Sequence, residues 1–208
     1  MKNIFVTGIG TDVGKTVVAA VLTEALRYDY WKPVQSGDFY GTDSDKIRSL
    51  VIDNSLVIHP ESILLKQALS PHAAAEQEGI VIDANNIQLP MAQRPIIIEG
   101  SGGVLVPLND NFFIADLIKK LNCEVVLVIQ NYLGSINHSL LTIEALKNRS
   151  IPIKGIVFNG APHEWSEGII QKTAQVNTIG HILPEKNIDS STIQKYATAF
   201  RENLKQNE

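Results

Sequence analysis

The stretch GIGTDVGKT, residues 8–16, has the residue types of a phosphate-binding loop, but its glycines are displaced. Such loops usually follow the pattern G-x-x-x-x-G-K-S/T. Gly14-Lys15-Thr16 matches the end of this pattern, whereas Ile9 stands where the first glycine is expected. Phosphate binding depends on backbone N–H groups turned toward the anion and on a helix N-terminus directly behind them. The displaced glycine therefore leaves the phosphate-binding chemistry intact.

The residues around this loop favour a phosphate site over the alternative, a glycine-rich turn before an ordinary helix. An apolar segment precedes the loop, and Val18, Leu22 and Leu26 recur behind it at helical spacing. In such a loop the Lys15 ammonium can reach the β- and γ-phosphates, and the Thr16 hydroxyl can bind Mg²⁺. The predicted phosphate-binding residues are Asp12, Val13, Gly14, Lys15, Thr16 and Val17.

Other charged residues stand where they could act on a bound phosphate. Glu99 directly follows the apolar run PIII. Its burial without a partner would be costly, and a bound Mg²⁺, which prefers oxygen ligands, would remove that cost. Asp43 and Asp45 begin a predicted helix, where the alternative role is capping. Lys32, in WKPVQSG, is either a solvent-exposed charge or an ammonium that stabilises charge developing during phosphoryl transfer.

Apolar runs rich in β-branched residues must position these groups. Their lack of polar alternation is typical of parallel strands buried on both faces, and helical patterns separate them. Strands are predicted at residues 3–8, 95–100, 124–130 and 153–159, with weaker candidates at 30–34 and 178–183. Helices are predicted at residues 15–27, 112–122, 136–148, 163–174 and 189–205, the last capped by Asp189 or Ser190.

This alternation predicts an α/β fold with a mostly parallel central sheet and helices on both faces, formed by one domain over residues 1–208. Ligands bind such sheets beyond the carboxyl ends of the strands. Four residues stand at predicted carboxyl ends: Gly8, Glu99, Gln130 and Asn159. We therefore expect the functional site at this edge of the sheet.

The composition excludes several classes of function. A net charge of −4 with scattered basic residues argues against nucleic acid as the main partner. No apolar run approaches the roughly 20 residues that span a bilayer, and the N-terminus has no signal-peptide pattern. Cys123 is the only cysteine and opens an apolar run, so we expect a buried packing residue, no internal disulfide and a cytoplasmic location.

Seven short motifs occur in the order found in dethiobiotin synthetases, and between residues 3 and about 186 the chain resembles this family. The motifs are GIGTDVGKT, WKPVQSG, DSD, SPH, EGSGG, LGSINH and FN. The resemblance implies a three-layer P-loop NTPase-type fold and an ATP- and Mg²⁺-dependent cyclo-ligase of biotin synthesis. In that reaction 7,8-diaminononanoate takes up CO₂ as a carbamate, ATP phosphorylates the carbamate, and the second amine closes the ring with loss of phosphate. It also implies a homodimer with the substrate near the interface.

The same resemblance implies roles for individual residues. Lys32 and Lys15 are the catalytic residues, and Lys32 binds the carbamate and the transferring phosphoryl group. Thr16, Asp45 and Glu99 bind Mg²⁺, which leaves Asp43 as a cap or an outer residue. The implied substrate-binding residues are Thr11, Ser36, Ser135, Ile136 and Asn137, with Ser135 also a candidate helix cap. The further implied nucleotide-binding residues are Asp45, Glu99, Gly100, Ser101, Gly102, Asn159, Gly160, Pro184 and Glu185, with Asn159 at the adenine edge.

Two features depart from the family pattern, and the SPH motif is expected to have a structural role only. Ser101 stands where the family more often has alanine, and the connection RYDYW before Lys32 is short. His72, in SPH, is expected to shape the pocket rather than to act in catalysis, because the histidines show no metal-ligand spacing. These departures affect element boundaries more than chemistry.

Two other functions share this fold. Nucleotide-switched ATPases of the partition and cell-division-site type carry a second lysine near the start of the loop, whereas Gly10-Thr11-Asp12 contains none. Amide-forming ligases such as the cobyrinic acid amidating enzymes carry a glutamine-hydrolysing domain, for which 208 residues leave no room. The sequence therefore favours the cyclo-ligase.

Overall fold

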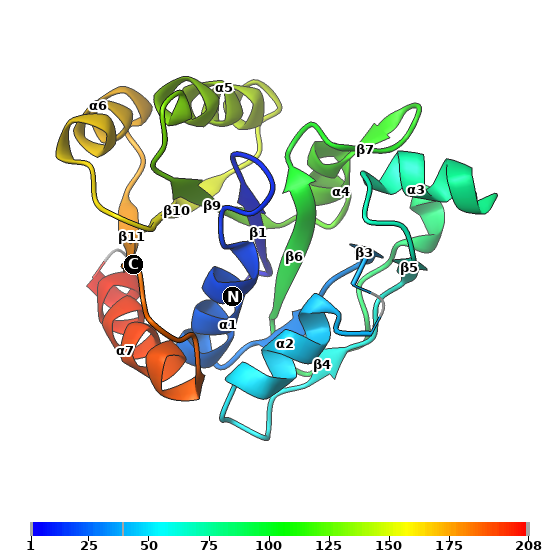
Figure 1. Ribbon diagram of the computed structural model, residues 1–208, viewed down its shortest axis with the longest axis horizontal. Helices are drawn as coiled ribbons and strands as arrows, with labels where there is room; N and C mark the ends of the chain where they lie inside the picture. Colours follow the sequence, from blue (N-terminus) through cyan, green and yellow to red (C-terminus); the bar gives the residue numbers. More distant parts are fainter. Residues whose placement is uncertain (1, 39, 207–208) are drawn as a thin grey trace.

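The described part of the chain, residues 2–38 and 40–206 of the computed structural model, is built around a seven-stranded parallel sheet (Figure 1). The strand order is β11-β10-β9-β1-β6-β2-β4, so β1, which leads into the phosphate loop, lies inside the sheet. The strands are β1 (Ile4–Gly8), β2 (Asp29–Trp31), β4 (Ile58–His59), β6 (Ile96–Gly103), β9 (Glu124–Gln130), β10 (Ile153–Asn159) and β11 (Thr178–Ile182).

Helices cover both faces of the sheet and form the predicted three layers (Figure 1). On β1, Ile4 and Val6 pack toward one helical layer and Phe5 toward the other, the two-residue alternation of a strand. One layer holds α1 (Lys15–Leu26), α2 (Asp43–Leu50) and α7 (Ser190–Gln206). The other holds α3 (Pro71–Glu78), α4 (Ile114–Lys120), α5 (Ser135–Asn148) and α6 (Glu164–Ala174).

Several boundaries differ from the sequence-based prediction. The strand expected at 30–34 is two strands, because Lys32 and Pro33 leave the main sheet and β3 (Val34–Ser36) pairs instead with β5 (Ile63–Leu65). Proline has no N–H to donate to a ladder. The helix expected from residue 112 begins at Ile114. The remaining short elements are the antiparallel pair β7 (Pro107–Asn109) and β8 (Phe112–Phe113), and a 3₁₀ turn at Ala84–Asn86.

Glu99 is also placed differently, because β6 continues four residues beyond it. The register between β1 and β6 is irregular there: Val6 pairs with Glu99, whereas Gly8 pairs with Gly103. Glu99 is therefore inside a strand rather than at its carboxyl end, and its side chain is buried. The irregular register brings the end of β6 beside the start of the phosphate loop.

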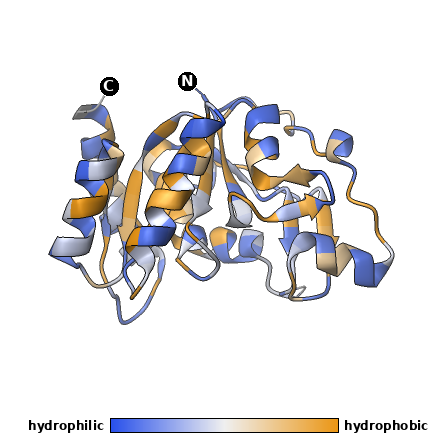
Figure 2. Ribbon diagram, turned by 90° about the horizontal axis from the view of Figure 1, so that it is seen from above, coloured by the Kyte–Doolittle hydropathy of each residue, from blue (hydrophilic) through white to orange (hydrophobic). Residues whose placement is uncertain are grey.

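The C-terminal helix α7 packs along α1 and completes its layer. Arg201 donates from Nε to Ala25 O at 2.8 Å and from Nη2 to Glu24 O at 3.1 Å, which satisfies carbonyls in the last turn of α1. Asp189 Oδ1 accepts from Thr192 N at 2.9 Å, as the predicted cap requires. In Figure 2 the central strands are largely apolar, whereas α7 carries polar and apolar residues together.

Residues 2–38 and 40–206 contain no helix with both the length and the apolar character needed to cross a bilayer.

Candidate active site

The loop between β1 and α1 has the backbone that a phosphate site requires. Gly14 adopts a left-handed conformation with φ 90° and directly precedes α1. A Cβ atom at Gly14 would lie 2.1 Å from Asn159 Nδ2, which donates a 2.9 Å hydrogen bond to Val13 O. Both the positive φ and this close contact require glycine. Asn159, at the end of β10, thus holds the loop in shape.

The displaced glycines have different roles. A Cβ atom at Gly8 would lie 2.4 Å from Val13 Cγ2, so the loop folds back tightly over Gly8. A Cβ atom at Gly10 would meet nothing within 4 Å. Gly10 O instead accepts a 2.8 Å hydrogen bond from Lys15 Nζ. Gly8, one residue before the usual position, is therefore the sterically required first glycine.

Beside the loop, a buried lysine lies between two carboxylates. Lys32 Nζ is 3.2 Å from Glu99 Oε1 and also pairs with Asp43 Oδ2. Thr16 Oγ1 donates to the same Glu99 oxygen at 2.9 Å. Burial disfavours the Lys32 ammonium, but Glu99 and Asp43 outweigh it and raise the Lys32 pKa above its usual 10.5. Lys32 therefore stays charged.

The pKa values of Lys15 and Lys32 are shifted in opposite directions. Burial is the largest influence on Lys15 and lowers its pKa below 10.5, while the nearby Lys32 charge adds to the lowering and Glu99 opposes it. A phosphate group bound at the loop would supply the negative charge that Lys15 lacks there. The site is therefore electrostatically suited to an anion beside two ammonium groups.

Asp43 and Asp45, at the start of α2, have different contacts in the structure. Asp45 Oδ2 accepts from the backbone N and Oγ1 of Thr42, both at 3.1 Å, and Thr42 Oγ1 accepts from Asp45 N. Asp45 Oδ1 pairs with Arg48 at 2.7 Å. This is a capping box, for which Thr42-x-x-Asp45 is a sequence signal. Thr42 is therefore the N-cap and Asp45 its N3 partner, whereas Asp43 is the carboxylate that faces Lys32.

The phosphate loop, Lys32, Asp43 and Glu99 line a cavity of about 720 Å³, whereas Asp45 does not line it. Its wall includes the phosphate loop, the β2–β3 connection, the first turn of α2 and the start of α3. Of the residues predicted from the sequence, it contains Thr11, Asp12, Gly14, Lys15, Thr16, Val17, Lys32, Ser36, Glu99, Ser101 and Gly102. It also contains Gln35, Asp38, Asp43, Lys46, Ala68, Leu69, Ser70, Pro71 and Val106.

Some residues predicted for this site support it from outside the cavity. Val13 is buried in the core, and a Cβ atom at Gly100 would lie 2.6 Å from Phe5 Cε1, so Gly100 is needed for packing. Ser101 lines the cavity and also donates a 2.6 Å hydrogen bond to Val34 O, which ties β6 to β3. The hydroxyl at residue 101 thus has a structural use in this chain.

Other predicted residues lie around neighbouring strand ends. Gly160 N donates to Ile182 O at 2.8 Å, which joins the end of β10 to the segment containing Pro184 and Glu185. Glu185 Oε1 accepts from Lys195 Nζ at 2.8 Å and Tyr196 Oη at 2.6 Å. None of these residues lines the 720 Å³ cavity.

The entry to α5 also lies outside the cavity, and its predicted cap is wrong. Gly134, with φ 104°, is the N-cap, and Ser135 is the first helical residue. The Ser135 hydroxyl is buried and has no hydrogen-bond partner among the described residues. Ile136 and Asn137 are exposed in the same first turn.

Sequence reasoning missed several residues that build the site. Tyr30 Oη donates to Glu99 Oε2 at 2.8 Å. Lys46 Nζ contacts Asp43 Oδ1 at 3.1 Å and Asp38 Oδ2 at 3.2 Å. Tyr30 lies in β2 and Lys32 directly follows that strand, but the bond from Tyr30 to Glu99, 69 residues away, has no local signal in the sequence.

The SPH motif contributes through its first two residues. Ser70 and Pro71 line the cavity, whereas His72 is not among the lining residues. His72 Nδ1 lies 3.1 Å from Ser70 Oγ. This arrangement accords with a pocket-shaping role for His72 through its neighbour.

The donors present suit Mg²⁺ when part of its shell comes from a nucleotide. No three Asp, Glu, His or Cys residues within the described part of the chain are grouped as a metal site of their own. The Thr16 hydroxyl and the buried Glu99 carboxylate lie together, with Asp43 near them. Mg²⁺ is usually held by one or two carboxylates together with substrate phosphates and water.

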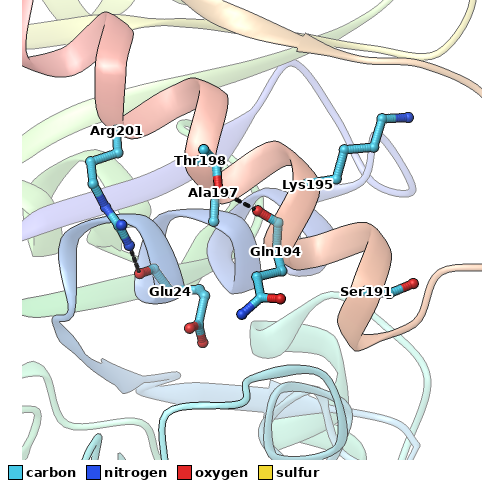
Figure 3. A pocket seen from close by; sticks show the side chains of 7 residues that line it. All are labelled: Glu24, Ser191, Gln194, Lys195, Ala197, Thr198 and Arg201. Atoms are coloured by element: carbon cyan, nitrogen blue, oxygen red, sulfur yellow. Dashed lines mark hydrogen bonds between the residues drawn. The ribbon is translucent and has the colours of Figure 1, made fainter.

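A second hollow of about 370 Å³ lies between α1 and α7 (Figure 3). It is lined by Glu24, Ser191, Gln194, Lys195, Ala197, Thr198 and Arg201. Arg201 is committed to α1 carbonyls, and Thr198 Oγ1 donates to Gln194 O at 3.0 Å. This second hollow contains none of the site residues predicted from the sequence.

A phosphate loop between an interior parallel strand and a helix, inside a three-layer α/β fold, defines a P-loop NTPase-type protein. A family model described as an AAA domain matches residues 2–192. A ParA family ATPase from Chlorobium tepidum has a similar fold, with a TM-score of 0.56 and 16% identity over 99% of this chain and 93% of that one. The septum site-determining protein MinD from Pyrococcus horikoshii also has a similar fold. Its TM-score is 0.56, with 15% identity over 99% of this chain and 96% of that one. At these identities the likeness shows the fold alone.

Sequence relatives narrow the class to one family. The chain is 52% identical to an ATP-dependent dethiobiotin synthetase from Cytophaga hutchinsonii, over 98% of both chains. It is 47% identical to one from Christiangramia forsetii, also over 98% of both chains. The chain belongs to the ATP-dependent dethiobiotin synthetase family. The resemblance inferred from the motifs is thus confirmed, and so is the prediction of an ATP-dependent ligase.

Proposed function

We propose that this protein carboxylates 7,8-diaminononanoate with CO₂ and closes the ring to dethiobiotin, using ATP and Mg²⁺ and releasing ADP and phosphate. Family membership supports ATP-dependent dethiobiotin synthesis in biotin biosynthesis as the overall reaction. One observation carries the proposed mechanism: the buried Lys32 ammonium contacts Glu99 and Asp43 beside the phosphate loop.

In this proposal the triphosphate of ATP lies along residues 12–17. The N-terminus of α1 presents its free amides there, which favours an anion. Lys15 exchanges its bond to Gly10 O for phosphate oxygens. Asn159 and Gly160, with Pro184 and Glu185, form the base side of the nucleotide site; the Gly160–Ile182 hydrogen bond that joins their two segments supports this grouping.

We propose that Thr16 and Glu99 hold Mg²⁺ with one carboxylate from the first turn of α2. Asp43 already lies in the cavity, whereas Asp45, which the family resemblance implies, would have to leave its capping box. Bound there, Mg²⁺ would withdraw charge from the phosphates and favour transfer of the γ-phosphoryl group. The buried Glu99 carboxylate would gain a second positive partner.

The reaction then needs no covalent intermediate on the protein. One substrate nitrogen adds to CO₂, and an oxygen of the resulting carbamate attacks the γ-phosphorus as the bond to ADP breaks. The second amine attacks the carbonyl carbon of the carbamic-phosphoric anhydride, and phosphate leaves. Lys32 stays protonated and stabilises the negative charge on the carbamate and the transferring group. Thr11 and Ser36, which line the cavity, orient the substrate.

We propose that a homodimer completes the substrate site. The start of α5 carries Ser135, Ile136 and Asn137, which lie outside the cavity of their own chain. Leu133, Ile136 and Leu141 are exposed in the same region. Exposed apolar groups of this kind are typical of protein interfaces. A second copy would cover them and bring its α5 amides to the distal carboxylate of the substrate. The cytoplasmic location predicted from the sequence stays a prediction.

Phosphate release from ATP tests this function against the switched-ATPase alternative. A ligase releases phosphate only when both the diamine and bicarbonate are present. A switched ATPase would respond instead to a protein, DNA or lipid surface. Phosphate release that is unchanged when either small substrate is omitted would contradict the proposal.

A further inference from the structure

Tyr30 is a buried residue that the mechanism above does not use. It lies in β2, and its side chain is fully buried. Its hydroxyl donates a 2.8 Å hydrogen bond to Glu99 Oε2, whereas Glu99 Oε1 accepts from Thr16 at 2.9 Å and Lys32 at 3.2 Å. The two carboxylate oxygens therefore have separate partners, one in the core and one at the cavity.

The direction and the position of this bond are fixed. A carboxylate can only accept, and a tyrosine hydroxyl has one hydrogen to donate. Tyr30 pairs in register with Ile97 of β6, two residues before Glu99, and Lys32 directly follows the end of β2. Tyr30 and Lys32 therefore reach the same carboxylate from one segment, each at a different oxygen.

We propose that Tyr30 is a positioning residue of the metal site, whose hydroxyl fixes Glu99 Oε2 and so keeps Oε1 beside Thr16 for the metal ion. This inference rests on the proposed function, to which the metal site belongs. Groups that hydrogen-bond a ligating side chain typically change metal affinity or activity about 10–100-fold when they are removed. Tyr30 acts through Glu99 and is not itself a ligand.

The test is the variant Tyr30→Phe, which removes one oxygen and keeps the buried ring. Mn²⁺ binding in the presence of ADP is followed by electron paramagnetic resonance. We expect the Mn²⁺ dissociation constant to rise about tenfold, while ADP binding in the presence of EDTA is unchanged. Tyr28→Phe removes the same atom from a buried tyrosine outside the cavity and serves as the matched control.

A double-mutant cycle separates positioning from general packing. In a Glu99→Gln background, Tyr30→Phe should change Mn²⁺ binding less than about twofold, because the group on which it acts is already altered. An equal effect in both backgrounds, or weaker ADP binding without metal, would assign Tyr30 a structural role and overturn the inference. Wild-type Mn²⁺ binding in Tyr30→Phe would overturn this inference alone. Absence of Mn²⁺ binding to wild-type protein with ADP would overturn the proposed metal site and this inference with it.

Discussion

Lys32 Nζ lies 3.2 Å from Glu99 Oε1, and both side chains are less than one tenth exposed. A buried ion pair of this kind gains little net stability, because desolvation offsets the attraction. Its value here is positional: Thr16 of the phosphate loop bonds to the same Glu99 oxygen. The Lys32 ammonium, the Glu99 carboxylate and the Thr16 hydroxyl are thus held in one connected group.

The conformation of the phosphate loop predicts a sharp contrast between two glycines. Gly14→Ala is expected to abolish nucleotide binding, because its positive φ and the nearby Asn159 amide both exclude a Cβ atom. Gly10→Ala is the matched control, since a Cβ atom there meets nothing within 4 Å. Titration with ADP, monitored by calorimetry, measures both. Equal binding by the two variants would contradict this account of the loop.

Asp45→Ala tests the capping box at the start of α2. The variant should lower the free energy of unfolding by about 1 kcal/mol, the usual value of a lost cap interaction. Asp43→Ala should leave the cap in place. Urea unfolding measures the stability of each variant, and Mg²⁺ titration of turnover shows which carboxylate the metal requires. A larger rise in Mg²⁺ requirement for Asp45→Ala would show that the capping box opens when the metal binds.

The Asp43–Lys32 pair predicts a pH dependence of stability. Burial acts to raise the Asp43 pKa, but Lys32 and Lys46 outweigh it and lower the pKa below 3.8. The contribution of Asp43 is therefore fully present above pH 3.8 and is lost as pH falls through the lower folded-state pKa. The difference in unfolding free energy between wild type and Asp43→Asn should shrink below this pH. A difference that stays constant in urea unfolding from pH 7 to about pH 3 would argue against the pair.

The exposed apolar residues at the start of α5 are the proposed dimer interface, so a charge placed there should disrupt the dimer. Leu133→Asp should convert a dimer to a monomer and reduce turnover, while ADP binding persists. Val81→Asp, at another highly exposed apolar residue, should leave the mass of the wild-type assembly unchanged. Light scattering after size exclusion measures the mass. If the wild-type protein is a monomer, or if the Leu133→Asp variant is still a dimer, the start of α5 does not form the proposed dimer interface.

Local patterns predict much of this fold and part of this site. Gly14-Lys15-Thr16 between apolar and helical segments is enough to place the phosphate loop, because that chemistry is local. Runs such as residues 124–130 predict the buried strands for the same reason. The contacts of Asp43 and Asp45 depend on which carboxylate joins the capping box of Thr42, and a local pattern marks Asp45, three residues after Thr42, for that position.

Contacts between distant residues were harder to predict. The Tyr30–Glu99 bond joins residues 69 positions apart and depends on how β2 pairs with β6. Asn159 reaches the phosphate loop across 146 positions. No local pattern encodes either distance, because sheet register is set by the whole fold. The sequence therefore predicts the loop more completely than its supporting residues.

The central claim is that Lys32 acts on a carbamate beside ATP, and carbon labelling tests it most directly. Purified protein is incubated with 7,8-diaminononanoate, Mg-ATP and ¹³C-bicarbonate, and dethiobiotin is detected by mass. We predict ATP-dependent product with one added ¹³C for wild type, and a loss of about 10²–10³-fold or more for Lys32→Ala, with the fold checked by circular dichroism and ADP binding retained. Labelled product formed by Lys32→Ala at the wild-type rate, or no labelled product from wild type, would contradict the account.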